Sequence, residues 1–128
     1  MKVLLDTHVI LWWLTDDPKL PEAPREVISG PGNEILASAA SAWEISTKYR
    51  LGKLPQAANV AVDFDSVLIR AGMTPLPITV AHAVRAGALE GDHRDPFDRM
   101  LIAQGQLESV PVVTGDFAFS LFDVELIW

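Results

Sequence analysis

The sequence predicts an α/β sandwich built around a mostly parallel sheet. Short apolar runs alternate with longer stretches whose apolar residues recur at helical spacing, which is the pattern of strand–helix–strand units. The chain has 128 residues, of which 49% are hydrophobic and 21% are charged, as in an ordinary globular domain with a real core. No internal repeat, low-complexity segment or domain boundary interrupts the pattern. We therefore expect a single domain over residues 1–128.

In the first half of the chain, two apolar runs of strand length are each followed by a helical pattern. The first run ends abruptly at Asp6, and the second leads into a long helical pattern that Gly52 closes as a C-cap. Between them, a short amphipathic helix is closed by the Gly30-Pro31-Gly32 breaker. The predicted elements are a strand at residues 2–5, helices at 9–14 and 21–29, a strand at 34–37 and a helix at 39–51.

The second half continues the alternation with more interruptions. Gly72 ends a helical region, and Pro75 and Pro77 restrict the next apolar run to the edge of the sheet. Thr79 is a good N-cap for the helix that follows it. The predicted elements are helical pieces at residues 56–62 and 64–71, an edge strand at 74–78, a helix at 80–89, a polar loop at 91–96, a helix at 97–108, a strand at 110–113, a helical turn at 117–120 and a last strand at 124–127.

Composition limits the classes of function. Lys and Arg number 10 against 17 Asp and Glu, for a net charge of −7, whereas a simple nucleic-acid-binding module normally carries a basic surface. The acidic balance is compatible with carboxylates gathered around divalent cations or with a basic partner. The absence of cysteine excludes disulfides and thiolate metal sites. With no signal peptide and no apolar run of the about 18 residues that span a bilayer, we expect a cytoplasmic protein with no membrane contact.

Four acids lie at the junctions of predicted elements, where a charge is least expected. Asp6 ends the first strand, and Asp116 lies three residues past the strand at 110–113. Glu44 lies one turn into its helix, and Asp98 lies at the start of another. Groups just beyond the carboxyl ends of parallel strands converge on one edge, where carboxylates would repel each other unless Mg²⁺ or Mn²⁺ neutralised them. Such a site suits phosphodiester hydrolysis, because a bound cation polarises a phosphoryl oxygen and generates hydroxide.

Ordinary structural roles for these acids stay open at this point. Asp98 can cap its helix, and Asp116 can form an Asx-turn. Glu44 is harder to explain in this way, because it lies between two apolar residues on a helix with few other charges. Asp95, three residues before Asp98, either faces the same pocket or belongs to the loop that enters the helix. Spacing alone does not choose between these alternatives.

Four segments carry residue patterns of a known family. They are Leu4-Leu5-Asp6-Thr7-His8, Ser41-Ala42-Trp43-Glu44-Ile45, the stretch from His93 to Gln104, and Val113-Thr114-Gly115-Asp116. These segments resemble the PIN domain and, more narrowly, the VapC toxins of bacterial type II toxin–antitoxin pairs. The resemblance runs from residue 3 to the end of the chain. It implies a three-layer α/β/α fold with a mostly parallel central sheet, and a Mg²⁺-dependent ribonuclease that a small antitoxin inhibits.

The resemblance also implies a role for each acid. Asp6 and Asp98 match the most direct metal ligands, while Glu44 and Asp116 complete the site, partly through water held by the metal. Thr114 matches a hydroxyl that supports the site, with Asp95 as a weaker candidate for the same pocket. The candidates for contact with substrate phosphate are Lys48, Arg99 and His93, of which Lys48 has the alternative of an i,i+4 salt bridge with Glu44.

The sequence also supports predictions for His8 and Gly105. His8 is expected to have a cap or surface role rather than a part in catalysis. Gly105 departs from the family, which frequently has Ala at this position, and glycine inside a helix costs about 1 kcal/mol relative to alanine. The departure concerns packing and leaves the acids untouched.

The resulting hypothesis is an endoribonuclease toxin in which metal held by Asp6 and Asp98, Mg²⁺ or Mn²⁺ as a substitute, activates a water for in-line attack on RNA. A basic segment of the cognate antitoxin is expected to occupy the acidic groove, with an arginine in the metal's place. Exposed apolar residues on the early helices, Leu11, Trp12 and Leu14, and the resemblance itself predict a homodimer. The alternative is a module of the same fold without turnover that binds a basic partner. A phosphotransferase of the Asp-x-Asp type is disfavoured, because position 8 is His8.

Overall fold

In the computed structural model, which describes all residues from Met1 to Trp128, five parallel strands form one sheet in the order β3-β2-β1-β4-β5. The strands are β1 (Lys2–Leu5), β2 (Glu34–Ser38), β3 (Thr74–Leu76), β4 (Val112–Val113) and β5 (Leu126–Ile127). The predicted parallel sheet is therefore confirmed. Because β1 is the central strand, Asp6 leaves the sheet between its two neighbours, β2 and β4.

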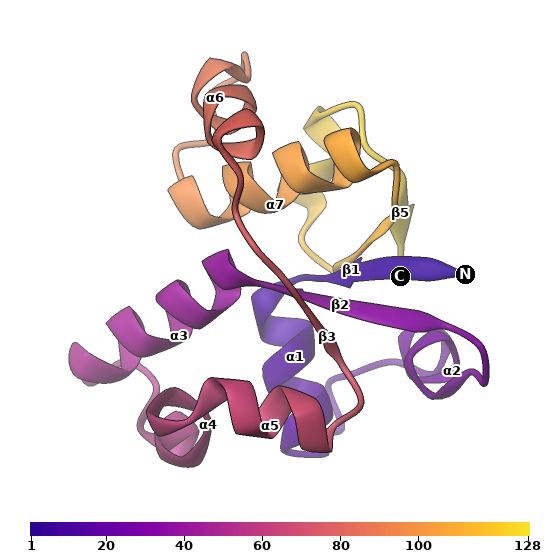
Figure 1. The fold of residues 1–128 in the computed structure, drawn as a ribbon, viewed down its shortest axis with the longest axis vertical. Helices are drawn as coiled ribbons and strands as arrows, with labels where there is room; N and C mark the ends of the chain where they lie inside the picture. Colours follow the sequence, from indigo (N-terminus) through magenta and orange to yellow (C-terminus); the bar gives the residue numbers. More distant parts are fainter.

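Helices cover both faces of this sheet. They are α1 (Thr7–Leu14), α2 (Glu22–Ser29), α3 (Ala39–Arg50), α4 (Ala58–Val62), α5 (Phe64–Arg70), α6 (Val80–Ala88) and α7 (Pro96–Glu108), with 3₁₀ turns η1 (Pro55–Ala57) and η2 (Phe117–Leu121). In Figure 1, α6 and α7 lie above the sheet, and α1, α2 and α5 lie below it. The three-layer α/β/α arrangement is confirmed. None of the helices combines the length and the apolar character that a membrane crossing requires.

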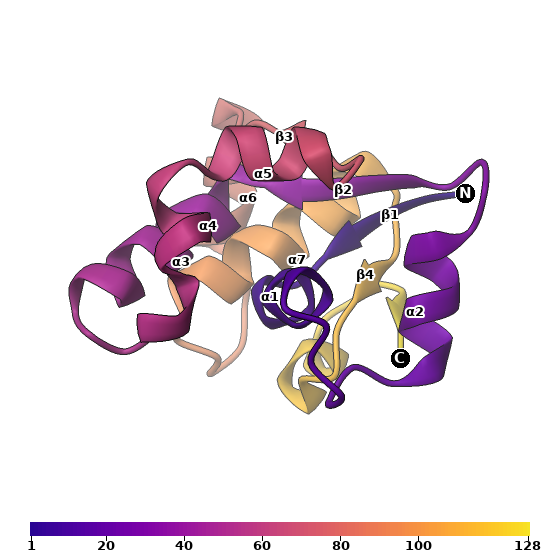
Figure 2. The same ribbon diagram turned by 90° about the horizontal axis from the view of Figure 1, so that it is seen from below.

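The continuous apolar run of β1 follows from this layering. Side chains alternate between the two faces of a strand, so a strand covered on both sides is apolar at every position. Val3 and Leu5 pack in the cluster on the α1 and α2 side, whereas Leu4 packs with Leu101 and Ile102 of α7. All of these side chains are fully buried. Figure 2, seen from below, shows α1 and α7 close to the end of β1. Asp6 follows this end of the strand.

Several predicted boundaries are confirmed, but three strands are shorter than predicted; β3 ends at Leu76 instead of residue 78, and β5 begins at Leu126 instead of residue 124. Gly52 has a φ of 75° directly after the C-cap of α3, and Thr79 Oγ1 accepts the His82 N–H at the start of α6 (3.1 Å). The strand predicted at 110–113 begins only at Val112. The Val110 N–H instead donates to Gly105 O (3.1 Å), because α7 ends in a left-handed Ser109 that turns the chain back.

Gly105 is a packing requirement of the α7–sheet interface. A Cβ at this position would lie 2.9 Å from Cγ2 of both Val112 and Val124, and 3.3 Å from Val110 O. The helix therefore lies too close to β4 and to the segment before β5 for an alanine, and this close approach explains the departure from the family pattern.

Gly105→Ala is expected to destabilise the protein by about 1–3 kcal/mol, since overpacking outweighs the better helix propensity of alanine. Urea denaturation of the variant beside the wild type measures this difference. Gly87→Ala is the matched control, because Gly87 lies on the exposed face of α6 with nothing near its absent Cβ. The control should be neutral or slightly stabilised. A Gly105→Ala variant as stable as the wild type would contradict the packing argument.

Candidate metal centre

A pocket of about 230 Å³ opens at the carboxyl edge of the central strands. The four predicted acids, Asp6, Glu44, Asp98 and Asp116, all line it, together with Asp95. They arrive from different elements, since Asp6 follows β1, Asp116 lies beyond β4, and Glu44 and Asp98 lie on α3 and α7. The remaining lining residues are Thr7, His8, Leu11, Lys48 and Leu54. The structure thus brings together residues that are distant in sequence, as the parallel topology requires.

Asp6 is buried and is held by three groups. Its Oδ1 accepts the Thr7 N–H (2.7 Å) as the N-cap of α1, and its Oδ2 accepts the Thr114 hydroxyl (2.6 Å). His8 Nδ1 lies 3.2 Å from the same Oδ2. The Thr114 hydroxyl also accepts the Asp116 N–H (3.0 Å), so this one side chain links Asp6 to the loop that carries Asp116. These contacts offset part of the cost of a buried carboxylate.

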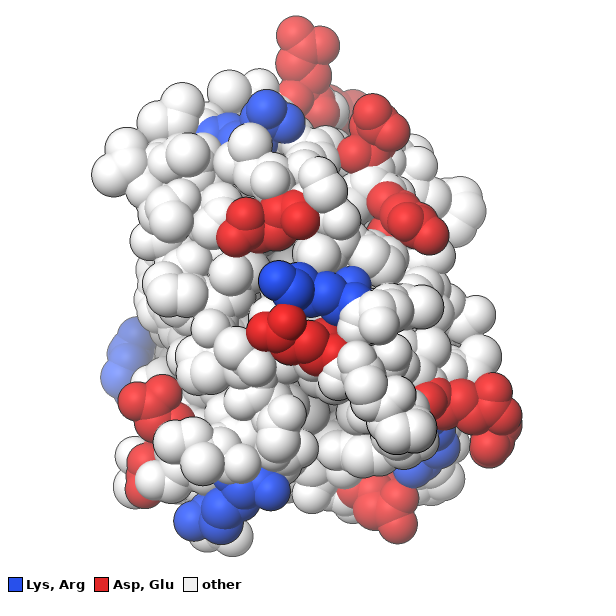
Figure 3. Space-filling model, turned by 45° about the vertical axis from the view of Figure 1, so that its right-hand side comes forward, with Lys and Arg blue, Asp and Glu red and all other residues white.

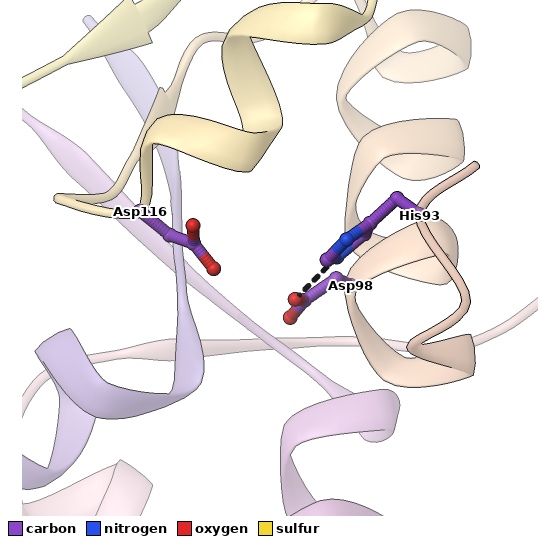
Figure 4. A group of neighbouring side chains, drawn as sticks. All are labelled: His93, Asp98 and Asp116. Carbon is purple, nitrogen blue, oxygen red and sulfur yellow. Dashed lines mark hydrogen bonds and ion pairs between the residues drawn. The ribbon is translucent and has the colours of Figure 1, made fainter. Parts of the chain in front are cut away.

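Asp98 forms a close group with His93 and Asp116. His93 Nε2 lies 2.8 Å from Asp98 Oδ2, and one donor atom from each of the three side chains lies within 4.8 Å of the others. Figure 4 shows His93 and Asp98 side by side, with the Asp116 carboxylate facing them from the other side of the site. His93, predicted only as a phosphate contact, is therefore placed directly among the acids.

The pKa of Asp98 reflects its burial and the repulsion between the neighbouring acids. Burial raises the pKa of Asp98 to about 7; the hydrogen bond with His93 opposes this rise, and the charges of Asp6, Asp95 and Glu44 add to it. Near neutral pH the carboxyl is therefore close to half protonated. A positive charge in the pocket would restore its ionised form.

Buried Glu44 pairs with the partly exposed Lys48 through one of its two carboxylate oxygens. Lys48 Nζ lies 2.5 Å from Glu44 Oε2 along α3, while Glu44 Oε1 is buried and has no hydrogen-bond partner. Burial lowers the pKa of Lys48, but the hydrogen bond and charge of Glu44, followed by the charges of Asp95 and Asp98, outweigh it and raise this pKa overall. Lys48 therefore forms the i,i+4 pair with Glu44 that was one of the sequence alternatives, and it also lines the pocket.

The structural roles left open for Asp95 and Asp116 are present in addition to their places in the pocket. Asp95 Oδ1 accepts the N–H groups of Phe97 (2.9 Å) and Asp98 (3.2 Å) as the N-cap of α7. Asp116 Oδ1 accepts the Ala118 N–H (2.9 Å) at the start of η2. These bonds use only Oδ1 of each side chain. Capping orients both acids and leaves Oδ2 for another partner.

Two sequence interpretations need correction. Arg99, predicted as a phosphate contact, does not line the pocket; its guanidinium donates to the backbone carbonyls of His93 (3.0 Å), Ala86 (3.2 Å) and Leu89. It holds the loop that carries His93. His8, expected to have a cap or surface role, lines the pocket beside Asp6. Burial lowers the pKa of His8, but its hydrogen bond with Asp6 and the charges of Asp6, Asp116 and Asp98 reverse this effect and raise it. The available signal was its position two residues after a strand-terminal acid.

The residues of the pocket fit a divalent cation. They offer carboxylate oxygens, which are the ligands that Mg²⁺ and Mn²⁺ prefer. The partnerless Glu44 Oε1 and the raised pKa of Asp98 both indicate negative charge that the protein's own groups do not fully satisfy. The protein is thus of the α/β class, with a parallel sheet and a cluster of carboxylates at the carboxyl edge of its strands that fits a divalent cation.

The chain belongs to the PIN domain family, whose model matches residues 3–125. Over 64 residues it is 42% identical to ribonuclease VapC16 of Mycobacterium tuberculosis, a match that covers 50% of this chain and 45% of that protein. The matched region thus spans about half the length of this curated relative.

Solved structures share the fold over nearly the whole chain. VapBC2 from Rickettsia felis, bound to a promoter DNA fragment, has a TM-score of 0.72 at 15% identity, covering 99% of this chain and 98% of its own. VapC20 of Mycobacterium tuberculosis, a toxin that cleaves the sarcin–ricin loop, has a TM-score of 0.68 at 13% identity, covering 95% of each chain. At these identities the similarity shows the fold alone.

Proposed function

We propose that the chain is a metal-dependent endoribonuclease and the toxin of a type II toxin–antitoxin pair. The observation that carries the proposal is the convergence of Asp6, Glu44, Asp98 and Asp116 on one pocket, where Glu44 Oε1 is buried without a partner. Membership of the PIN domain family supports a nuclease, and the similarity to ribonuclease VapC16 supports RNA as the substrate.

Several residues in and around the pocket have a role in the proposed hydrolysis. Asp6, Asp98 and Asp116 would hold the cation, Mg²⁺ with Mn²⁺ as a substitute, and Glu44 would complete the site. The cation supplies a Lewis acid that polarises a phosphoryl oxygen and lowers the pKa of water. Thr114 orients Asp6 through its hydroxyl, and the α1 N-terminus fixes the other oxygen. Lys48 stays cationic at the pocket wall, where it can hold a substrate phosphate.

The charge of the protein is an obstacle for an RNA substrate. With a net charge of −7, the chain repels a polyanion. On the face seen in Figure 3, basic side chains are scattered among acidic ones and do not form a continuous basic patch. The cation and Lys48 must therefore offset the repulsion locally.

The same charge suits a protein inhibitor. A basic antitoxin segment, with an arginine guanidinium paired to the pocket carboxylates, would complement the acidic site. VapBC2, which shares the fold, supports a partner of this kind.

We also propose a homodimer, although the residues first expected to be exposed for it are half-buried. Leu11, Trp12 and Leu14 are half-buried and pack against the core clusters. Large exposed apolar side chains lie elsewhere, on α3, α4, α6 and η2; they include Trp43, Val62, Val80, Val84 and Phe117. Measurement of the mass in solution tests this part of the proposal.

The nuclease proposal is tested by incubating the purified protein with end-labelled RNA. We expect cleavage in Mg²⁺ or Mn²⁺, no cleavage in excess EDTA, and recovery when Mn²⁺ is added beyond the chelator. Equal cleavage with and without EDTA would contradict metal dependence. Absence of cleavage of total cellular RNA under every metal condition would contradict the nuclease and favour a binding module of the same fold.

A further inference from the structure

We propose that His93 is a direct nitrogen ligand of the metal, so that this centre selects a first-row transition ion such as Mn²⁺ over Mg²⁺. The inference rests on the proposed function, because it concerns two of the same carboxylates, Asp98 and Asp116; His93 lies beside them but does not itself line the pocket. It adds a nitrogen donor to a site that sequence interpretation had composed entirely of oxygen.

The first support is the geometry of the donor atoms. His93 Nε2 lies 2.8 Å from Asp98 Oδ2, and one donor atom each from His93, Asp98 and Asp116 lies within 4.8 Å of the other two. For an octahedral ion with bonds of about 2.1 Å, adjacent donors lie about 3 Å apart and opposite donors about 4.2 Å apart. The His93 and Asp98 atoms therefore match adjacent corners, and Asp116 reaches a third corner with a small adjustment. Figure 4 shows the three side chains pointing toward a common centre.

The second support is independent of this group and comes from α3. Glu44 is 94% buried, since its exposed fraction is 6%, and its Oε1 has no hydrogen-bond partner. It lines the same pocket as Asp98 and Asp116. A buried carboxylate oxygen without a donor is costly, so it indicates that the pocket receives a positively charged ligand.

The third support is that His93 is held in place. Its backbone carbonyl accepts from Arg99 Nη1 (3.0 Å), and its ring packs edge-on against Phe122, with centroids 6.3 Å apart. Arg99 is itself anchored on two further carbonyls of the same loop and of α6. Arg99 therefore hydrogen-bonds to backbone carbonyls and fixes the loop that carries His93.

His8, the histidine that lines the pocket, is placed differently. His8 stacks edge-on with Trp12 at 4.8 Å, and only its Nδ1 approaches an acid, Asp6. It is not part of the three-residue donor group. His8 is thus the natural control for a nitrogen ligand.

The chemical consequence is metal selectivity. Mg²⁺ favours oxygen ligands and retains its water, whereas first-row transition ions also accept imidazole nitrogen, with Mn²⁺ the weakest binder among them. A centre with one histidine and several carboxylates should therefore bind Mn²⁺ more tightly than Mg²⁺, and part of that difference should depend on His93.

The test uses the whole protein loaded with Mn²⁺ alone, without RNA. Pulsed electron paramagnetic resonance detects the nitrogen coupling of a directly bound imidazole, and calorimetry measures Mn²⁺ and Mg²⁺ affinities. We expect the coupling in the wild type and in His8→Gln, and its loss in His93→Gln. Loss of His93 should weaken Mn²⁺ binding about tenfold or more, with a much smaller change for Mg²⁺.

The outcomes separate this inference from the proposed function. Mn²⁺ binding without nitrogen coupling in the wild type would overturn the role of His93 and leave an all-oxygen nuclease site standing. Coupling that survives in His93→Gln but disappears in His8→Gln would also overturn it. Failure of the wild type to bind either ion would contradict both the inference and the proposed function.

Discussion

Replacing Asp6 with asparagine is expected to reduce RNA cleavage by at least about 100-fold, because it removes a charged ligand from the point where charge must be stabilised. The fold should survive the change. Asparagine is as good an N-cap as aspartate, so the bond from the Thr7 N–H is retained. The new amide group can still hydrogen-bond with the Thr114 hydroxyl.

Initial rates of RNA cleavage and Mn²⁺ affinity, measured on the same preparation, check this expectation. Asp123→Asn is the matched control, since Asp123 is an exposed acid outside the pocket and the change of charge is identical. The control should cleave like the wild type. If Asp6→Asn keeps its melting temperature and loses both metal and activity, the effect belongs to the site. Cleavage by Asp6→Asn at the wild-type rate would contradict the assignment of Asp6.

Asp98→Asn is expected to stabilise the metal-free protein while it weakens metal binding. The wild-type carboxylate is buried beside other acids, and its pKa is raised from an ordinary value of 3.8 to about 7. Keeping it ionised therefore costs folding free energy when no cation is present. Removal of the charge should raise the free energy of unfolding above neutral pH by at least about 1 kcal/mol, which is several degrees in melting temperature.

The pH dependence has a defined sign. Between the ordinary pKa and the raised one, the folded protein holds a proton on Asp98 that the unfolded chain releases. The contribution of this group to stability is therefore full below pH 3.8 and is lost as pH rises toward 7. The advantage of Asp98→Asn should be larger at about pH 8 than at about pH 5, measured by urea denaturation in EDTA.

Added Mn²⁺ should reverse the order of stability, because the wild type gains binding free energy that the variant lacks. Asp123→Asn again serves as the control, and its difference from the wild type should depend little on the metal. An Asp98→Asn variant that is less stable than the wild type in EDTA at alkaline pH would contradict an electrostatically strained cluster.

The sequence by itself determined the elements of the fold and the identity of the acids. Some signals act within a few residues, so they can be recognised without tertiary information. They are the period of apolar residues, Gly52 after α3 and Thr79 before α6. The acids stand out for a related reason. A carboxyl group directly after a buried central strand, as at Asp6, is improbable unless the fold uses it.

Only the tertiary structure decided which partners the polar groups find. Thr114 reaches Asp6 across 108 positions of sequence, Arg99 turns to backbone carbonyls, and His93 joins Asp98. Local pattern does not show these choices, because a long side chain or a loop can satisfy its hydrogen bonds in several directions. The packed neighbours decide among them: α7 lies so close to β4 that Gly105 has no room for a Cβ. The acids could be predicted from the sequence, whereas the packing of α7 and the loop before it determines that His93 lies beside Asp98.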